Sequence, residues 1–417
     1  MQYGLIGKPL GHSMSPKIHS LLGNENYELC ELNENELGDF FAKREFKGIN
    51  VTIPYKEKVM PYLDFIDDNA KKIGSVNTIV NKEGKLYGYN TDYDGFKELI
   101  ESSNIEVKGK NVLVLGSGGT SKTVTAVLKD KGVTNIKIVS RNSNENKISY
   151  EEALKEVDTN IIVNTTPQGM YPHTARYPLA INEFKALEAV IDVIFNPLNS
   201  RLVCFARKRK LKAVGGLKIL VVQAIKAHEL FFDTLLDEQV KRDIYNKIYK
   251  EKVNIVLIGM PGCGKSTIAK YLSKELNKTL VDLDKEIEKQ EEMLIKDIFA
   301  SSGEDYFREV ETKITRKYAK LHGQVISCGG GIIKKHQNIE MLRQNGFIIF
   351  VNRNVNLLEA LKSGKRPLAR TKEDLQRLFK ERRHLYLKAA DQVYKNDELF
   401  LDCAIKIKEG FDEINDY

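Results

Sequence analysis

Residues able to hold a phosphate group stand together between Gly259 and Thr267, in the run Gly-Met-Pro-Gly-Cys-Gly-Lys-Ser-Thr. An apolar stretch typical of a buried strand, residues 253–258, precedes the run, and apolar residues at helical spacing follow it in 268–276. This is the spacing of a phosphate-binding loop, whose glycines let successive N–H groups point at phosphate oxygens beside the positive end of a helix. The alternative is a tight strand–helix turn with a chance Gly-Lys-Ser.

We expect Lys265 to reach the β- and γ-phosphates of a nucleotide, ATP by the chemistry of this loop, and Ser266 to ligate Mg²⁺. Asp282 and Asp284 close the next apolar segment, two residues apart, so both carboxylates face one side. One, for which we choose Asp282, can hold Mg²⁺ through water, and the other can orient an attacking hydroxyl. Both can also simply begin a helix expected over 285–290. The nucleotide-binding residues predicted here are Gly262, Cys263, Gly264, Lys265, Ser266 and Thr267.

A second glycine turn, Gly116-Ser-Gly-Gly, follows an apolar run at 110–115 and precedes a helix expected over 123–130. With a further strand at 135–139 it forms a βαβ unit whose turn is aimed at a pyrophosphate. That strand ends in Ser140-Arg141-Asn142, where a protein that binds NAD usually carries an acidic residue. Because an arginine attracts the 2′-phosphate that a carboxylate would repel, the sequence favours NADP. The residues predicted to bind it are Gly116, Gly118, Gly119, Ser140, Arg141 and Asn142.

Small polar residues recur at strand ends in the first hundred residues. Ser13 and Ser15 stand on a loop after the first strand, where they can grip a carboxylate or simply cap the following helix. The alternating segment 49–56 and the segments around 77 and 92 add further hydroxyl, amide and charged groups, and this pattern predicts a pocket for a polyhydroxylated small molecule. The polar residues in question are Ser13, Ser15, Asn50, Thr52, Lys56, Asn77 and Asp92.

These segments, taken in order, resemble the shikimate dehydrogenase family. The resemblance implies that Ser13 and Ser15 contact the substrate carboxylate, that Lys56 is the catalytic lysine, and that Lys56 and Asp92 hold the reacting hydroxyl. The chemistry is consistent, since an alcohol that loses a hydride must also lose a proton, which a lysine beside a carboxylate can take or return. Lys56 as an ordinary surface lysine is the alternative.

The same resemblance extends through the glycine turn to residue 224. Residues 161–170 resemble the family's loop beside the cofactor, which implies a cofactor contact for Thr165, and 215–224 resemble the segment that implies Gly216 and Gln223 as cofactor and substrate contacts. Two departures stand out. Phe195 replaces the usual tyrosine, and Ser140-Arg141-Asn142 lacks the family's second arginine.

Residues 251–417 resemble shikimate kinase over their whole length. The resemblance rests on the phosphate loop, on Phe307-Arg-Glu-Val-Glu, on Ser327-Cys-Gly-Gly-Gly-Ile and on two arginine segments at 365–368 and 381–386. It implies that Asp284 binds substrate hydroxyls and acts as the base, and that Arg366 in a lid stabilises the transferring phosphate. It also implies an arginine clamp on the substrate carboxylate and a backbone contact with its ring, from Arg308 (supported by Glu311), Arg382 and Gly330.

Composition limits the class of protein. At 417 residues the chain requires two or three domains, and 42% hydrophobic with 29% charged residues is ordinary for a globular protein. The net charge of +8 suits anionic ligands, but no basic stripe interleaved with aromatics indicates nucleic acid. The five cysteines are scattered without a C-x-x-C pair, and no apolar run reaches ~18 residues, so we expect neither disulfides nor a membrane segment, and a cytoplasmic location.

The sequence thus predicts an α/β protein. We expect a substrate domain at 1–100 completed by helices at about 218–248, a Rossmann domain for NADP at 101–217, and a P-loop kinase domain with a parallel sheet at 251–417. A short charged linker is expected near 247–252, with no indication of a channel. The implied activities are reduction of 3-dehydroshikimate to shikimate with NADPH and phosphorylation of shikimate with MgATP. The oligomeric state is left open. Alternatives are a quinate/shikimate oxidoreductase fused to another small-molecule kinase, and a sensor of shikimate-type ligands without turnover.

Overall fold

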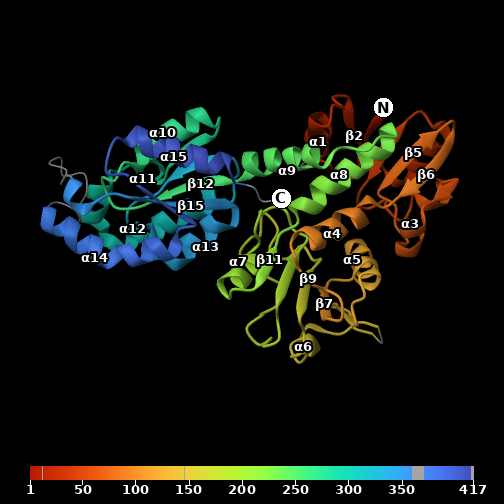
Figure 1. Cartoon of the computed structure of the whole chain (residues 1–417), viewed down its shortest axis with the longest axis horizontal. Coiled ribbons are helices and arrows are strands. Elements are labelled where there is room, and N and C mark those ends of the chain that lie inside the picture. The colour runs from red at the N-terminus through yellow and green to blue at the C-terminus, as the bar shows by residue number, and fades with distance from the viewer. Residues whose placement is uncertain (12, 145, 359–370, 415–417) are drawn as a thin grey trace.

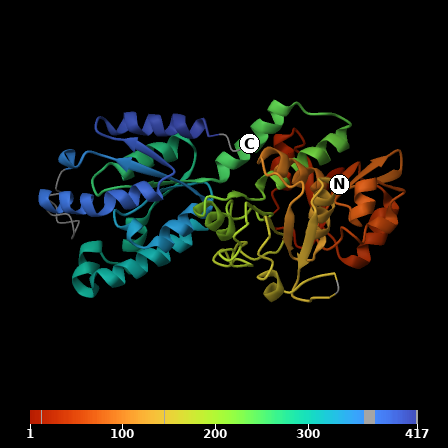
Figure 2. The ribbon, with the colours of Figure 1, turned by 60° about the horizontal axis from the view of Figure 1, so that its bottom comes forward.

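The computed structural model of the chain describes residues 1–11, 13–144, 146–358 and 371–414, and in these ranges it forms three β-sheets in chain order (Figure 1). The first and third sheets lie towards opposite ends of the molecule in both views (Figures 1 and 2). Within the described residues, no helix is both long enough and apolar enough to cross a membrane.

The first sheet is mixed and has the strand order β2-β1-β3-β5-β6-β4. Its strands are β1 (Tyr3–Gly7), β2 (Tyr27–Glu31), β3 (Gly48–Val51), β4 (Phe65–Ile66), β5 (Thr78–Lys82) and β6 (Lys85–Tyr89). Its helices are α1 (Ser15–Leu21), α2 (Leu37–Lys43), α3 (Asp68–Ile73) and α4 (Thr91–Ser102), with short 3-10 turns η1 (Glu34–Glu36) and η2 (Met60–Tyr62).

The hairpin of β5 and β6 turns at Glu83 and Gly84, whose φ angles are 52° and 81°. Positive φ at both central residues gives a turn whose twist matches that of the strands. Thr78 consequently pairs with Tyr89, so the residues just before β5 and just after β6 meet at one end of the sheet. This register brings residues 77 and 90–92 together.

The second sheet is parallel, with the order β11-β10-β9-β7-β8. Its strands are β7 (Asn111–Leu115), β8 (Asn135–Val139), β9 (Ile161–Asn164), β10 (Ala189–Asp192) and β11 (Lys212–Val214), and its helices are α5 (Gly119–Asp130), α6 (Tyr150–Ala153) and α7 (Arg201–Lys208). The chain leaves β7 towards β8 on one side and returns to β9 on the other. The loops after these three strands therefore border the crevice at the reversal of strand order, where such sheets bind ligands.

Two helices follow the second sheet, α8 (Leu217–Phe232) and α9 (Glu238–Lys252). The sequence predicted helices at about 218–248. In the structure the first ends at Asp233 in a left-handed conformation, and Asp237 caps the second, which continues to Lys252. The residues expected to form a linker, 247–252, are the last turns of α9 instead. α8 packs on α4 and α1, and α9 runs directly into the third sheet (Figure 1).

The third sheet is also parallel, with the order β13-β14-β12-β15-β16. Its strands are β12 (Asn254–Ile258), β13 (Thr279–Asp282), β14 (Gln324–Ser327), β15 (Gly346–Asn352) and β16 (Gln392–Lys395). Its helices are α10 (Lys265–Glu275), α11 (Leu283–Glu291), α12 (Ile295–Ala319), α13 (His336–Asn345), α14 (Lys372–Ala389) and α15 (Phe400–Asp412), with 3-10 turns η3 (Ile332–Lys334) and η4 (Val355–Leu357). The phosphate-binding run follows the central strand β12, whose five residues are all buried.

Candidate active sites

Lys56 and Asp92 form an ion pair at the carboxyl end of the first sheet. The Lys56 Nζ lies 2.6 Å from Asp92 Oδ2, and about a quarter of each side chain is exposed, 26% and 23%. Lys56 follows β3, while Asp92 is the second residue of α4, directly after the β5–β6 hairpin. The sheet thus joins two residues 36 positions apart in a place that a small molecule can reach.

Asn77 and Asn50 lie behind this pair and are buried, with 2% and 5% exposure. Asn77 Oδ1 accepts hydrogen bonds from the Thr91 N–H at 2.7 Å and from Thr78 Oγ1 at 3.2 Å. Asn50 receives a hydrogen bond from the Tyr27 hydroxyl at 2.7 Å and donates one to Thr78 Oγ1 at 3.0 Å. In the structure Asn50 therefore orders neighbouring polar groups, because both ends of its amide are engaged within the protein.

The remaining residues predicted to bind this substrate lie at the start of α1, directly after β3 and on α8. Ser13 Oγ accepts from the Ser15 N–H at 3.2 Å, and Met14 rather than either serine is the N-cap of α1. Thr52 follows β3 and is partly exposed. Gln223 lies on α8, where its Nε2 donates to the Leu220 carbonyl at 2.9 Å.

A cavity of about 620 Å³ lies at the carboxyl end of the second sheet. The glycine turn after β7 forms one wall, the end of β8 forms another, and the segment after β9 forms the third. The Ser140 and Ser117 hydroxyls are 3.2 Å apart, and exposed Arg141 stands at the rim. Of the residues predicted to bind NADP, the cavity is lined by Gly116, Gly118, Ser140, Arg141, Asn142 and Thr165.

Two predicted cofactor residues do not line this cavity. Gly119 begins α5 beside it. Gly216 is the N-cap of α8, and its backbone N–H donates to the Ile194 carbonyl at 2.8 Å. A Cβ at Gly216 would overlap the Val193 carbonyl, so this glycine permits the chain after β10 to pack against the start of α8.

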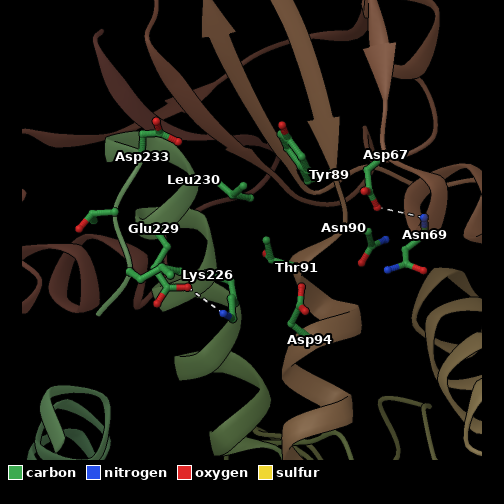
Figure 3. A pocket seen from close by; sticks show the side chains of 12 residues that line it. Asp67, Asn69, Tyr89, Asn90, Thr91, Asp94, Lys226, Glu229, Leu230 and Asp233 are labelled. Atoms are coloured by element: carbon green, nitrogen blue, oxygen red, sulfur yellow. Dashed lines mark hydrogen bonds and ion pairs between the residues drawn. The ribbon is translucent and has the colours of Figure 1, made fainter. Parts of the chain in front are cut away.

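A different cavity, of about 480 Å³, lies between the first turn of α4 and the last turns of α8 (Figure 3). Figure 3 shows Asn90, Thr91 and Asp94 on one side and Lys226 and Glu229, which form an ion pair of 2.8 Å, on the other. None of the residues that the sequence assigns to a site lines it. This cavity is therefore separate from the pair of Lys56 and Asp92.

The phosphate-binding run forms a turn with positive φ at Gly259, Gly262 and Gly264. Lys265 is buried, and its Nζ donates to the Gly259 and Met260 carbonyls at 2.9 Å each. A Cβ at Gly264 would lie 2.5 Å from Phe400, so a side chain at this position would displace the turn. The turn and its lysine fit a nucleotide phosphate, with the N-terminus of α10 directly behind.

The two acids at the end of β13, Asp282 and Asp284, lie in different surroundings. Asp282 Oδ2 accepts from the Ser266 hydroxyl at 2.9 Å, and Asp282 is also the N-cap of α11. A hydroxyl and a carboxylate oxygen side by side fit Mg²⁺, which takes few protein ligands and keeps water and phosphate oxygens. Asp284 lies instead beside the glycine triplet, where a Cβ on Gly329 would be 2.5 Å from its Oδ1.

Two arginines converge on the same triplet. Arg382 Nη1 donates to the Gly330 carbonyl at 2.9 Å, and the Arg308 guanidinium lies against Gly331. Arg308 is buried and pairs with Glu311 at 2.8 Å and Glu304 at 3.0 Å. Burial alone would lower the pKa of Arg308, but these carboxylates raise it, so the guanidinium stays charged.

Several residues of these sites were assigned no role from the sequence. Tyr150 and Tyr177 line the second-sheet cavity, and Tyr386 donates to the Gly330 carbonyl at 2.5 Å. Glu304 lies four residues before Arg308 on α12, a spacing that could have identified it as an ion-pair partner. Arg366, expected in a lid, lies outside the described residues.

Comparison with known proteins gives matches in both parts of the chain. Residues 5–79 match the family model of the shikimate dehydrogenase substrate binding domain, and residues 261–409 match that of shikimate kinase. A shikimate dehydrogenase (NADP(+)) of Clostridium beijerinckii is 40% identical over 260 residues, which are 58% of this chain and 96% of the relative.

Solved structures of shikimate dehydrogenases match about three fifths of the chain. A chorismate mutase/shikimate 5-dehydrogenase fusion protein from Clostridium acetobutylicum has a TM-score of 0.56 at 37% identity, covering 59% of this chain and 96% of its own. Shikimate 5-dehydrogenase from Thermus thermophilus, solved with NADP(H) and shikimate, has a TM-score of 0.53 at 29% identity and covers 59% and 99%. The α/β fold and the Rossmann-like sheet are thus those of the family. The chain belongs to the shikimate dehydrogenase family and carries a shikimate kinase domain after it, which makes it a bifunctional enzyme of the shikimate pathway.

Proposed function

We propose that the dehydrogenase part reduces 3-dehydroshikimate to shikimate with NADPH, and that the kinase part phosphorylates shikimate with MgATP to shikimate 3-phosphate. We assign residues 1–100 with about 218–248 to the substrate domain, 101–217 to the NADP domain and 251–417 to the kinase. The observation that carries the first activity is the 2.6 Å pair of Lys56 and Asp92. The kinase proposal is carried by the convergence of Asp284, Arg308 and Arg382 on Gly329–Gly331.

In the first reaction Lys56 and Asp92 bind the oxygen of the reacting carbon, and Lys56 supplies or takes the proton at that oxygen. Bound NADPH supplies the hydride. Ser13 and Ser15 contact the carboxylate of the ring, while Asn77 holds Thr91 and the start of α4, and so fixes the position of Asp92. Arg141 at the rim of the second-sheet cavity favours the 2′-phosphate of NADP.

In the second reaction the arginines Arg308 and Arg382 bind the substrate carboxylate, because a planar guanidinium matches a carboxylate in two hydrogen bonds. Asp284 orients the attacking hydroxyl and accepts its proton. Lys265, released from the loop carbonyls, would contact the nucleotide phosphates. Ser266 and Asp282 would hold Mg²⁺, which would neutralise the charge of those phosphates.

The test is a coupled assay of the purified chain with 3-dehydroshikimate, NADPH and ATP. We expect NADPH consumption without ATP, and formation of shikimate 3-phosphate, detected by mass spectrometry, only when ATP and Mg²⁺ are added. In parallel, the reverse reaction is measured as oxidation of shikimate with NADP⁺, and quinate and NAD⁺ replace shikimate and NADP⁺ in turn. A preference for quinate, or binding of shikimate without any turnover, would reject this assignment in favour of a quinate oxidoreductase or a sensor.

A further inference from the structure

The loop between β10 and α7, residues 193–200, is hydrogen-bonded to the kinase at three of its residues. Asn345 Oδ1, at the end of α13, accepts from the Leu198 N–H at 2.9 Å, and the Gln344 carbonyl accepts from the Asn199 N–H at 2.8 Å. His322 Nε2 lies 2.8 Å from Asn196 Oδ1. Two segments of the kinase, the end of α13 and the loop containing His322, thus hold three residues of one dehydrogenase loop.

The side chain of Gln344 makes a separate contact with the dehydrogenase. Its Nε2 donates to the Thr174 carbonyl at 2.9 Å, and both residues are buried. Thr174 is three residues from Tyr177 and four from Pro178, which line the second-sheet cavity. Arg201 Nη1 donates to the carbonyl of Ala175, in the same segment, at 2.7 Å. The kinase therefore holds the backbone that leads into one wall of the proposed NADP pocket.

A buried chain of hydrogen bonds connects the 193–200 loop to another wall of that pocket. Asp192, fully buried, accepts from Ser200 at 2.5 Å and from Asn164 Nδ2 at 3.0 Å. Asn164 Oδ1 in turn accepts from the Thr166 N–H at 3.0 Å and from its hydroxyl at 2.7 Å. Thr166 and Gln168 line the cavity.

The apolar core is also continuous across the junction. Leu198, Leu217 and Val221 of the dehydrogenase belong to one buried cluster with Ile248 of α9 and the strands of the third sheet. Such a junction resembles the interior of a single domain rather than a flexible tether. Movement of the 193–200 loop relative to the kinase is therefore restrained by both packing and hydrogen bonds.

We propose that the kinase domain positions the NADP pocket of the dehydrogenase, and that Gln344 and Asn345 are the positioning residues. The inference rests on the proposed NADP-dependent function. The inference goes beyond that function because it gives the kinase domain a role in NADP binding by the dehydrogenase, and this role is independent of kinase turnover. Because coupling of two sites is reciprocal, NADP⁺ bound at the pocket must in turn stabilise the contact with α13.

The test compares Gln344→Ala with Gln337→Ala, an exposed glutamine on the same helix, in the full chain. Gln344→Ala removes the bond to Thr174 but keeps the backbone bond to Asn199. We expect the KM for NADP⁺ to rise about 5-fold or more with kcat changed less than about twofold, the pattern of lost positioning rather than lost chemistry. Gln337→Ala should leave both constants unchanged, and kinase activity should survive in each variant. Asn345→Ala is the second variant for the same measurement.

Hydrogen exchange provides a readout that does not depend on turnover. Without nucleotide, amides of 164–178 and 193–200 should exchange faster in Gln344→Ala than in wild type, while those of β12 and α10 should not change. With NADP⁺ alone, the C-terminal turn of α13 should become more protected in wild type. Unchanged exchange in 164–178 together with an unchanged NADP⁺ affinity overturns the inference. If wild type binds no NADP⁺, the proposed function fails, and the exchange result still shows whether Gln344 orders this wall.

Discussion

Lys56 Nζ lies 2.6 Å from Asp92 Oδ2, so the proposed proton donor of the dehydrogenase is held by a residue that only the fold brings to it. Neither side chain is fully buried, and both lie where strand ends meet helix α4. The pair can therefore both fix the lysine and present it to a substrate oxygen.

Lys56→Ala should lower dehydrogenase kcat by about 10²- to 10⁴-fold, because it removes the group that transfers the proton. The rate of NADP⁺ reduction with shikimate measures this effect. Lys58→Ala is the matched control, since Lys58 is on the same segment and pairs only with Glu34 among the ion pairs found here. Kinase activity should be unchanged in both. Loss of both activities in Lys56→Ala would argue against two separate sites.

Arg141→Asp should reverse the choice of nicotinamide cofactor. The substitution removes a cation at the cavity rim and places a carboxylate where the 2′-phosphate is expected. We therefore expect kcat/KM for NADP⁺ to fall about 10- to 100-fold, the usual effect of losing a hydrogen bond to a charged group. The same constant for NAD⁺ should change little, since NAD⁺ has no phosphate there. Lys129→Asp, an exposed lysine on α5, controls for the general loss of positive charge.

Gly331→Ala should weaken shikimate binding by the kinase. An added Cβ would overlap the Arg308 guanidinium, which Glu311 and Glu304 hold in place, so the arginine must move from its position. We expect the KM for shikimate to rise about 10-fold or more, the usual effect of losing one charge-assisted hydrogen bond, while the KM for ATP changes little. Gly38→Ala, where no atom lies within 4 Å of the new Cβ, should affect neither activity. Equal rises in both KM values would indicate general disruption instead.

Strands and glycine turns were accessible from the sequence because they depend on local pattern. The strand expected at 135–139 coincides with β8, and the runs at 110–115 and 253–258 each contain a strand one residue shorter. Phosphate loops and strand-end residues carry the same local signal. The positions of Lys56, Lys265 and Arg141 after the carboxyl ends of strands follow from this.

The rest depended on packing that no local pattern records. Both ends of the Asn50 amide are hydrogen-bonded, because Tyr27 reaches its oxygen from edge strand β2 and Thr78 accepts from its nitrogen on the antiparallel strand β5. The exact break between α8 and α9 depends on Asp233 taking a left-handed conformation and on Asp237 capping the second helix. Gln344 and Asn345 sit in a polar helix end typical of a solvated surface, yet both are buried and bond to Thr174 and Leu198 of the dehydrogenase.

The last prediction concerns acid and the junction of the two enzymes. His322 contacts Asn196 across the junction, and burial, with Lys252 and Lys278 nearby, lowers its pKa from 6.5 to about 4. Between pH 6.5 and 4 the His322 imidazole is therefore protonated in the unfolded chain but neutral in the folded chain. Neutral His322 therefore contributes its full stabilisation to the folded chain above about pH 6.5. As the pH falls towards 4, the free energy of unfolding decreases by up to about 3 kcal/mol. Urea unfolding of wild type and His322→Gln at pH 7.5 and 4.5 measures the difference, and His384→Gln, an exposed histidine, is the control. If His322→Gln loses as much stability on acidification as wild type, protonation of His322 is not what weakens the junction.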